Sequence, residues 1–596
     1  MTIAERNIEA LQKNAFGGYL IDYLAANKNN NCNMLFESRY NTSNELKWAS
    51  KKLDFNKHSN FIMLGIGNGY LIENIYKTMS NQSTITVIEK YNNVLSHCFG
   101  NKDLSDILSD NRVCIIGSDE VEEISKILDV RLRSEDIVYN TPNFQFITMP
   151  YLKSQDEAFI SKIMYNVSSQ IIYHTISYGN DINDVLEGFE HIVENWNNML
   201  HNKGVNDFKD AYCNVPAIIV SAGPSLDKNI EALIHANKKA LILAVDATAN
   251  KVMKLGINPD SISTIERPDK MFSIFYETMN VSEESVFIGP PVVTHKIIDK
   301  FDKTIILGRE GELITKMMTG LFDYDSIEIG MSCSHIPFAF AKYVGANPII
   351  FIGQDLAFAP DGRTHYSGVE SYVADNVNKS DLKTVVGQNG EMLQTNSAYY
   401  SFLLWFENEI AKTKGTTFIN ATEGGARIKG THQMNLIDVI NTYCREEIIG
   451  LGKKYLNIKE NDDKDIQKIT ERSKIVFERM MTSTDEINDF LFTKLENIED
   501  LYKLPHKLDS HMDLLNEIFT KLSLDTTLRF ILQPYYVSFY RKTRQFPVKM
   551  SDSEWNLLTF EIINFMKKTV NIMMVLKEKF SDYYRYISGG TDGETH

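Results

Sequence analysis

Between about residues 215 and 356 the chain repeats one local pattern: a short apolar run, a turn rich in small or polar residues, and often an amphipathic segment. The clearest copy is AIIVSAGPSLDKNIEALIHA, and later apolar runs occur in ALILAVDAT, SISTIE, SVFIGP, TIILGR and NPIIFIGQDL. Apolar runs of this length that alternate with helical segments predict a parallel β-sheet with crossover helices. The middle of the chain is therefore predicted to be an open α/β domain.

The same alternation occurs once more near the N-terminus and is absent near the C-terminus. NFIML, GIGNGY, LIENIYKTM and STITVIEK read as strand, turn, helix and strand, whereas after about residue 431 the apolar residues follow helical spacing. A chain of 596 residues is also long enough for several domains. We predict an N-terminal Rossmann-like α/β domain at residues 1–204, a central Rossmann-like α/β domain at 205–435 and a C-terminal all-α helical domain at 436–596.

Charge and composition exclude several classes of protein. The formal net charge is -16, which disfavours binding to a nucleic-acid backbone but leaves room for a small nucleotide in a local pocket. The six cysteines are scattered and form no Cys/His cluster, so neither a disulfide framework nor a zinc site is indicated. No secretory signal and no long apolar run is present. We expect a cytoplasmic protein without a membrane span.

The turn after AIIV is the first candidate ligand site. In SAGPSL a glycine permits a close approach of the backbone, and Pro and Ser suit the start of a helix whose N–H groups can face a phosphate. The alternative is an ordinary turn between a strand and a helix. The candidate residues are Ala222, Gly223, Pro224 and Ser225.

Polar residues at other predicted strand ends extend this site, because ligands of open α/β sheets lie beyond the carboxyl ends of the strands. Asp246 lies at the end of the strand predicted in ALILAVDAT, and Glu266 lies at the end of SISTIE. Alternatively, Asp246 caps a helix and Glu266 pairs with Arg267. Gln354 and Asp355 follow NPIIFI.

Two further segments complete the candidate site. Ser332, Cys333 and Ser334 precede a predicted helix and either offer donors to an anion or simply cap that helix. His365 lies in a polar loop and is either a general base or a solvated surface group. No Ser-His-Asp order, HExxH motif or Walker A sequence is present, and no clear DxD pair occurs at a predicted strand end, so a metal-bound sugar nucleotide is not indicated.

Taken in order, these segments resemble a known family. SAGPSL, AVDAT, LGINPDSISTIE, GMSCSH, GANPIIFIGQDLAF, THYSG and FINATEGGARIKG, within about residues 205–435, are similar to the motility-associated factor (Maf) proteins. The resemblance implies transfer of a nonulosonic acid, of the pseudaminic or legionaminic type, from a CMP-activated donor to Ser or Thr of flagellin. No cofactor is firmly implied, and the CMP-activated sugar enters as the donor substrate.

The central domain is also similar in motif order to bacterial sialyltransferases. There a G-x-G-P-S-L turn, a polar strand end and a Ser-rich helix start hold the CMP, and a histidine acts as base; His365 is the closest match to that histidine. This sequence departs from the pattern at Ser221, which replaces a glycine, and at Asp246, which replaces an amide. A carboxylate beside a phosphate is repelled, so Asp246 is expected at the ribose or the cytosine.

The N-terminal domain contains a second glycine-rich turn. Gly65, Gly67 and Gly69 follow a predicted strand, and Glu89 ends the next strand, as in nucleotide-binding or S-adenosylmethionine-binding turns. We favour a Rossmann-like domain without a ligand, with a role in presenting flagellin as the alternative.

Two other functions remain open at this point. The central domain also resembles an archaeal pterin pyrophosphokinase, for which Asp246 and Asp355 would supply a carboxylate pair for ATP-bound Mg²⁺. The chain can also be a non-catalytic flagellin-binding chaperone with a vestigial nucleotide fold.

Overall fold

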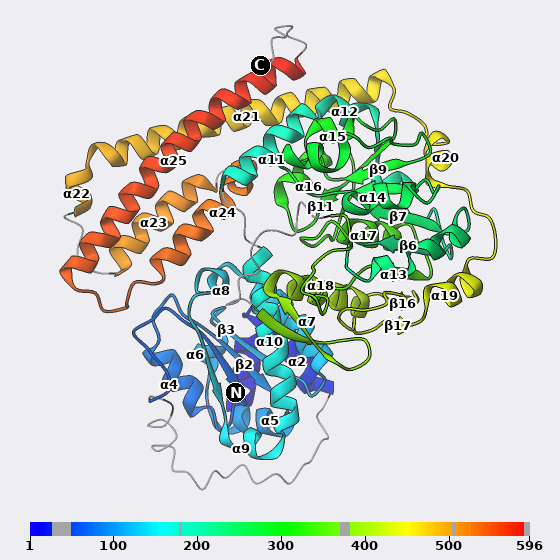
Figure 1. The fold of residues 1–596 in the computed structure, drawn as a ribbon. Helices are drawn as coiled ribbons and strands as arrows, with labels where there is room; N and C mark the ends of the chain where they lie inside the picture. The colour runs from blue at the N-terminus through cyan, green and yellow to red at the C-terminus, as the bar shows by residue number, and fades with distance from the viewer. Residues whose placement is uncertain are drawn as a thin grey trace. The chain divides into compact units, whose positions relative to one another are not determined.

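The computed structural model describes residues 1–26, 49, 51–177, 182–369, 382–502, 508–523 and 525–588. The chain forms two compact units. Unit 1 comprises Met1–Gly179, Ile487–Leu522 and Gln533–Ile572, and unit 2 comprises Asn180–Glu486, Ser523–Leu532 and Met573–His596. Each unit is built on its own parallel sheet (Figure 1).

The sheet of unit 1 has four parallel strands in the order β3-β2-β1-β4. Side chains alternate between its two faces, so Phe61 and Met63 pack into one apolar cluster while Ile62 and Leu64 pack into another. Both faces are therefore buried by helices, as expected for a parallel sheet. The strands are β1 (Asn60–Leu64), β2 (Thr84–Glu89), β3 (Val113–Gly117) and β4 (Phe144–Thr148). The helices are α1 (Ile3–Gln12), α2 (Gly17–Ala26), α4 (Tyr70–Thr78), α5 (Asn92–Asn101), α6 (Ser105–Leu108), α7 (Val121–Leu132), α8 (Glu135–Tyr139), α9 (Pro150–Gln155) and α10 (Glu157–Ser177).

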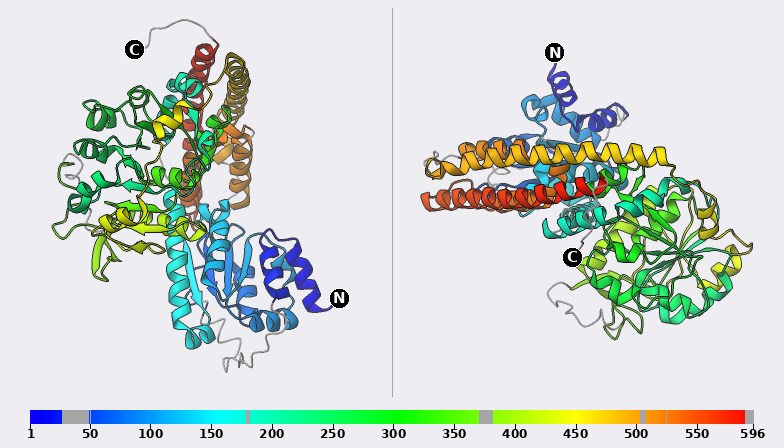
Figure 2. Two further views of the ribbon diagram at one scale, coloured as in Figure 1. Left: turned by 90° about the vertical axis from the view of Figure 1, so that its right-hand side faces the viewer. Right: turned by 90° about the horizontal axis from the view of Figure 1, so that it is seen from above.

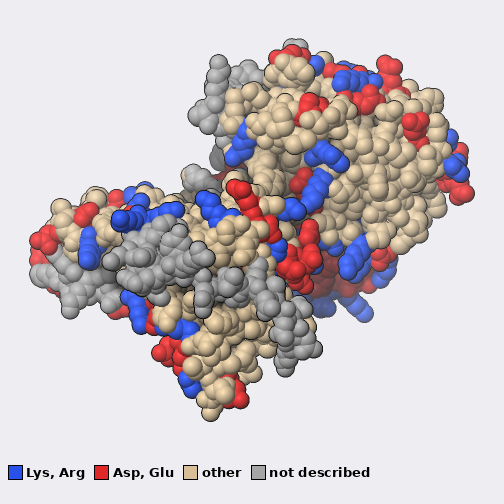
Figure 3. Space-filling view, turned by 90° about the horizontal axis from the view of Figure 1, so that it is seen from below, with Lys and Arg blue, Asp and Glu red and all other residues tan. Residues whose placement is uncertain are grey.

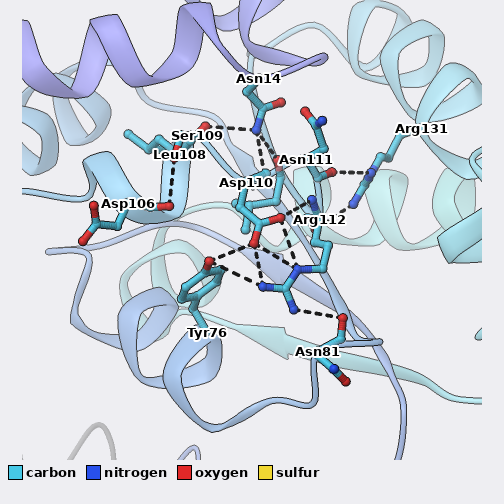
Figure 4. A network of polar contacts seen from close by, with 11 residues as sticks. Asn14, Tyr76, Asn81, Asp106, Leu108, Ser109, Asp110, Asn111, Arg112 and Arg131 are labelled. Atoms are coloured by element: carbon cyan, nitrogen blue, oxygen red, sulfur yellow. Dashed lines mark hydrogen bonds and ion pairs between the residues drawn. The ribbon is translucent and has the colours of Figure 1, made fainter. Parts of the chain in front are cut away.

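A polar network closes the loop that leads into β3 (Figure 4). The carboxylate of Asp110 accepts hydrogen bonds from the guanidinium of Arg112, at 2.6 Å for Nη2, and from the hydroxyl of Tyr76 at 2.8 Å. The guanidinium of Arg131 is buried, and it donates to the carbonyl oxygens of Asn111 and Arg112 at 3.1 and 2.8 Å. These contacts satisfy backbone groups that a buried loop would otherwise leave unpaired.

The sheet of unit 2 has nine parallel strands in the order β17-β16-β13-β6-β7-β8-β9-β10-β5, with helices on both faces (Figure 2). The strands are β5 (Lys203–Gly204), β6 (Ala217–Val220), β7 (Leu241–Val245), β8 (Ser261–Ser263), β9 (Val286–Gly289), β10 (Thr304–Ile306), β13 (Ile349–Ile352), β16 (Phe418–Asn420) and β17 (His432–Gln433). Two separate pairs are β11 (Gly308–Arg309) with β12 (Ser326–Ile327), and β14 (Leu382–Val386) with β15 (Met392–Asn396).

Helices lie between these strands and on either side of them along the chain. They are α11 (Ile182–Glu194), α12 (Trp196–His201), η1 (Val205–Phe208), α13 (Leu226–Asn229), η2 (Ile230–Ala236), α14 (Asp246–Met253), η3 (Phe272–Tyr276), α15 (His295–Ile298), α16 (Leu313–Gly320), α17 (His335–Tyr343), α18 (Ser397–Lys412), α19 (Leu436–Tyr443) and α20 (Leu451–Leu456).

The C-terminal part is a large helical region. Its helices are α21 (Asp463–Glu496), α22 (Ile498–Tyr502), α23 (Leu508–Leu522), α24 (Thr526–Thr543) and α25 (Asp552–Ile587). In unit 2 the first part of α21 and the last part of α25 lie side by side (Figures 1 and 2) and are joined by Lys577–Asp485 at 2.5 Å and Tyr584–Glu478 at 2.7 Å. The predicted combination of parallel α/β sheets with a helical C-terminal region is confirmed, while the three domain boundaries stay predictions.

The distribution of surface charge and the apolar character of the helices can be compared with what the sequence predicted. Basic and acidic side chains are interspersed on the face drawn in Figure 3, so the described part of that face presents mixed charge. None of the described helices has both the length and the apolar composition that a bilayer crossing requires.

Candidate functional site

The candidate residues follow neighbouring strands of the nine-stranded sheet. β16, β13, β6, β7 and β8 are consecutive and parallel, so their carboxyl ends share one edge of unit 2. Residues 353–355 follow β13, residues 221–225 follow β6, and Asp246 directly follows β7. Glu266 lies three residues beyond β8, because that strand ends at Ser263. This edge is where an open parallel sheet presents its loops to a ligand.

Helix α17 brings the Ser-Cys-Ser segment to the same edge. Its C-terminal end lies at the amino ends of the strands, because the N–H of Tyr212 donates to the carbonyl of Val344 at 2.8 Å just before β6. Its N-terminal end is therefore at the carboxyl edge, and Sγ of Cys333 lies 3.6 Å from Oγ1 of Thr264 and 3.9 Å from Oε1 of Glu266. The turns at 221–225 and 330–334 thus meet one edge of the sheet.

The helices that follow these two turns cover opposite faces of the sheet. Phe338 of α17 packs against the Phe351 ring at 5.6 Å between centroids, whereas Leu233 of η2 packs in the cluster that contains Ile350 and Ile352. Adjacent residues of a strand point to opposite faces. The carboxyl edge is consequently bordered by turns from both layers of helices.

Ser225 and Asp355 join the turn after β6 to the segment after β13. The carboxylate of Asp355 accepts the Ser225 hydroxyl at 2.7 Å and the Ser225 N–H at 3.2 and 3.3 Å. Both residues are buried, and burial raises the pKa of Asp355 to about 6. Asp355 is therefore held inside the protein by the turn that was predicted to bind the ligand.

These bonds correct one expectation about the turn. The N–H of Gly223 donates to the carbonyl of Gly353 at 2.7 Å, the N–H of Ser225 donates to Asp355, and Pro224 has no N–H to offer. The donors at Gly223 and Ser225 are engaged within the protein and do not point freely at an anion. A role of Ala222–Ser225 in ligand binding stays a prediction.

Gln354 also turns inward. Its Oε1 accepts the Ser221 hydroxyl at 2.6 Å, and its backbone N–H donates to Oγ1 of Thr422 at 3.2 Å. Ser221, where the sialyltransferase pattern has glycine, therefore has a structural partner in this chain. The pair links the loops after β6, β13 and β16.

Asp246, Glu266 and Cys333 gather at the ends of β7 and β8. Asp246 is buried; burial raises its pKa to about 7, and the nearby charge of Glu266 acts in the same direction. Burial also raises the pKa of Glu266, with Asp184 adding to the effect, and raises the pKa of the Cys333 thiol well above its usual value. This end of the edge is rich in carboxyl groups that resist ionisation, which suits hydroxyl or amino groups and disfavours a phosphate.

The loop that carries His365 is bound to the residues that follow β6 and β7. The next residue, Tyr366, donates its N–H to the carbonyl of Ala222 at 3.0 Å and its hydroxyl to the carbonyl of Ala247 at 2.6 Å. The hydroxyl of Thr364 lies 2.9 Å from Nδ1 of His365, and burial lowers the pKa of His365. The imidazole is therefore neutral near pH 7, as a general base must be.

Several contributors at this edge were not singled out from the sequence. Asp227 holds the His365 loop by accepting the N–H and hydroxyl of Ser367 at 2.9 and 2.8 Å. Arg309 donates to the carbonyl of Gly330 at 3.1 Å and pairs with Glu312 at 3.2 Å, which fixes the start of the Ser-Cys-Ser segment. Gly424 and Gly425, which follow β16, also border this edge, and among these contributors only they carry a local sequence signal, since Gly-Gly marks a tight turn.

In unit 1 the glycine-rich turn is filled by the protein itself. The carboxylate of Glu89 accepts the N–H of Ile66 at 2.9 Å and the hydroxyl of Tyr151. A Cβ on Gly65 would lie 2.6 Å from that hydroxyl, and one on Gly67 would lie 2.7 Å from Cε of Met149. Tyr151 and Met149 thus pack against the turn, and the absence of a ligand there stays a prediction.

No metal centre is evident in the part of the chain that the structure describes. There, no three His, Cys, Asp or Glu side chains gather as candidate ligands. Asp246 and Asp355, the pair considered for Mg²⁺, follow β7 and β13, which lie on either side of β6.

Comparison with known proteins agrees with this architecture. A family model described as "MptE-like: 6-hydroxymethylpterin diphosphokinase MptE-like" matches residues 190–361. A solved structure of a MAf glycosyltransferase from Magnetospirillum magneticum AMB-1 is similar with a TM-score of 0.54 and 15% identity, covering 95% of this chain and 88% of that one. This chain has the Maf glycosyltransferase fold. The resemblance seen in the Maf-like motifs is thus confirmed for the fold, along nearly the whole chain. No curated protein matches the sequence.

Proposed function

We propose that this Maf-fold protein is a glycosyltransferase that moves a nonulosonic acid, of the pseudaminic or legionaminic type, from a CMP-activated donor to Ser or Thr of flagellin. The proposal rests on the convergence of the Maf-like motifs. Segments 221–225, 246, 332–334, 353–355 and 364–366, up to about 140 residues apart, meet at the carboxyl edge of one parallel sheet. That edge is the general ligand site of open α/β sheets.

The chemistry assigned to this edge is a single displacement. The acceptor oxygen forms a bond to the anomeric carbon of the sugar, and the bond from that carbon to the phosphate oxygen breaks, so CMP leaves with the electron pair. His365, which burial keeps neutral, takes the proton of the acceptor hydroxyl. A base in this position contributes about 10²–10⁴-fold to the rate.

The nucleoside of the donor is assigned to the end of the edge near β7 and β8. Asp246 and Glu266 accept from the ribose hydroxyls or from the amino group of cytosine, and Ser332–Ser334 border the same end through Cys333. Gln354 and Asp355 are assigned an indirect role. They accept hydrogen bonds from Ser221 and Ser225 and so fix the conformation of the turn after β6. Flagellin as the acceptor and a cytoplasmic location are proposed from the family resemblance.

The family match over residues 190–361 favours a second candidate, a pterin diphosphokinase. That reaction uses ATP with Mg²⁺ and a pterin alcohol, and it asks for metal-binding carboxylates at this same edge. Asp355 is already bound by Ser225, and Asp246 is separated from it by β6. The engagement of Asp355 by Ser225 therefore supports the transferase better.

Ligand binding separates the candidates. In a thermal-shift titration of the full chain, the transferase account predicts that CMP raises Tm and that ATP with Mg²⁺, alone or with a hydroxymethylpterin, does not. Stabilisation by ATP with Mg²⁺ and not by CMP would establish the kinase instead. A chain that binds flagellin but no nucleotide would be the non-catalytic chaperone.

A further inference from the structure

The anionic donor needs a positive partner that the candidate residues do not supply. A CMP-activated nonulosonic acid carries a phosphate and a sugar carboxylate, while the chain has a formal net charge of -16. The N–H groups of Gly223 and Ser225 are engaged, and the β7–β8 end gathers carboxyl groups. An anion near the turn after β6 is therefore best stabilised by a cation close to that turn.

Lys228 is placed for this task. It follows the turn in α13, is exposed, and donates from Nζ to the carbonyl of Glu423 at 2.6 Å. A Cβ built on Gly424 would lie 3.7 Å from Nζ and 3.5 Å from Oδ1 of Asp355, so the ammonium stands over the loops after β13 and β16. An ammonium has three donors, and the carbonyl of Glu423 uses one of them.

The neighbouring cations are already neutralised. Lys251 and Arg363 both pair with the carboxylate of Asp227, whose pKa is lowered to about 2. Lys228 forms no ion pair within 4.0 Å with any residue that the structure describes. It does favour the ionised form of Asp355, although burial has the larger, opposite effect on that pKa.

We propose that Nζ of Lys228, together with the Gly424–Gly425 turn, forms the subsite for an anionic group of the donor. The edge is then electrically polarised: the nucleoside lies toward β7 and β8, and the phosphate or the sugar carboxylate lies toward β13 and β16. Gly424 leaves room for the anion, since a Cβ there would make only ordinary contacts of 3.4 Å or more. This inference rests on the proposed function, because it names the subsite of the same donor.

The test compares binding of cytidine, CMP and CMP-N-acetylneuraminic acid by calorimetry. If the phosphate is the bound anion, Lys228→Met is expected to weaken the binding of CMP by about 10- to 100-fold and to leave the affinity for cytidine unchanged. If the sugar carboxylate is the bound anion instead, the affinities for CMP and cytidine stay the same and only the binding of the CMP-sugar becomes weaker. Lys228→Arg should retain most of the affinity, because it keeps the charge.

A second pair of variants leaves Lys228 in place. Gly424→Glu puts a carboxylate beside the ammonium and is expected to bind the anionic ligand more weakly than Gly424→Gln, which has the same size without the charge. Lys254→Met, an exposed charge removal at the far end of α14, is the control for net charge.

Two results overturn the assignment. Either Lys228→Met binds cytidine, CMP and the CMP-sugar more weakly by the same factor, or it binds all three as tightly as the wild type does. A wild-type chain that binds none of the three ligands is a different result, because it rejects the proposed function itself.

Discussion

Ser225 donates both its hydroxyl and its backbone N–H to the carboxylate of Asp355, 130 residues further along the chain. The carbonyl of Asp355 in turn accepts the N–H of Ala426. One buried residue thus holds together the loops after β6, β13 and β16, and the shape of the carboxyl edge depends on it.

Removing this carboxylate is expected to destabilise unit 2. Asp355→Ala leaves the N–H and the hydroxyl of Ser225 buried without an acceptor, at a cost of about 1–3 kcal/mol. Asp355→Asn keeps an acceptor and should cost less. Thermal unfolding measures both variants, and an unchanged Tm for Asp355→Ala would show that the contact does not support the fold.

Gly223 cannot carry a side chain without displacing Asp355. A Cβ at this position would lie 2.1 Å from Oδ2 of Asp355 and 2.5 Å from the carbonyl oxygen of Gly353. We expect Gly223→Ala to lower stability by about 1–3 kcal/mol through overpacking. Gly311→Ala is the matched control, because a Cβ there meets nothing within 4 Å. Equal Tm values for the two variants would contradict this account of the turn.

Asp246 makes the stability of unit 2 depend on pH. Its pKa rises from 3.8 in the free residue to about 7 in the fold, so between these values the folded state holds a proton that the unfolded chain has lost. Stability therefore falls as pH rises through this window, by at most about 4 kcal/mol from this group. Asp246→Asn should remove that part of the slope and stabilise the protein most above pH 7. Denaturant unfolding across pH tests this, with the exposed Asp302→Asn as control; the same slope in wild type and Asp246→Asn would refute it.

His365 should set the acid side of the pH–rate profile. Burial lowers its pKa below the ordinary value of 6.5, so kcat/KM should decline with falling pH only at a lower pH than it would for an exposed histidine. His365→Ala should lower kcat by about 10²–10⁴-fold with little change in Tm. A folded His365→Ala protein with the full transfer rate would exclude His365 as the base.

Tyr151 is expected to be structural. Tyr151→Phe removes the hydroxyl that donates to the buried Glu89 and should destabilise unit 1 by about 1–3 kcal/mol. Because Tyr151 and Met149 fill the glycine-rich turn, S-adenosylmethionine and dinucleotides should not raise the Tm of the wild type. Saturable binding of either ligand to unit 1 would contradict this assignment.

The sequence predicted the sheet of unit 2 well because its strands are short apolar runs bounded by turn residues. AIIV, LILAV and IIFI became β6, β7 and β13, and Asp246 follows its strand as expected. Glu266 was placed at a strand end but lies three residues beyond it, because the polar Thr264 leaves the ladder and hydrogen-bonds locally to the N–H of Glu266.

The internal contacts of the site were beyond sequence reasoning. Nothing local in SAGPSL shows that Ser225 faces Asp355 or that Ser221 faces Gln354, since both pairs form only when β6 and β13 become neighbours in the sheet. The turn therefore looked like an anion site with free donors, whereas tertiary contacts engage two of them. Lys228 was missed for the same reason, because its partner Glu423 is 195 residues away in the sequence.

The most direct test of the central claim is the intact mass of flagellin after incubation with the purified chain and a CMP-activated nonulosonic acid. The transferase account predicts mass increases equal to whole nonulosonic acid residues, together with release of CMP, and a much smaller increase with His365→Ala. Flagellin of unchanged mass, in the presence of a folded chain and an intact donor, would contradict it.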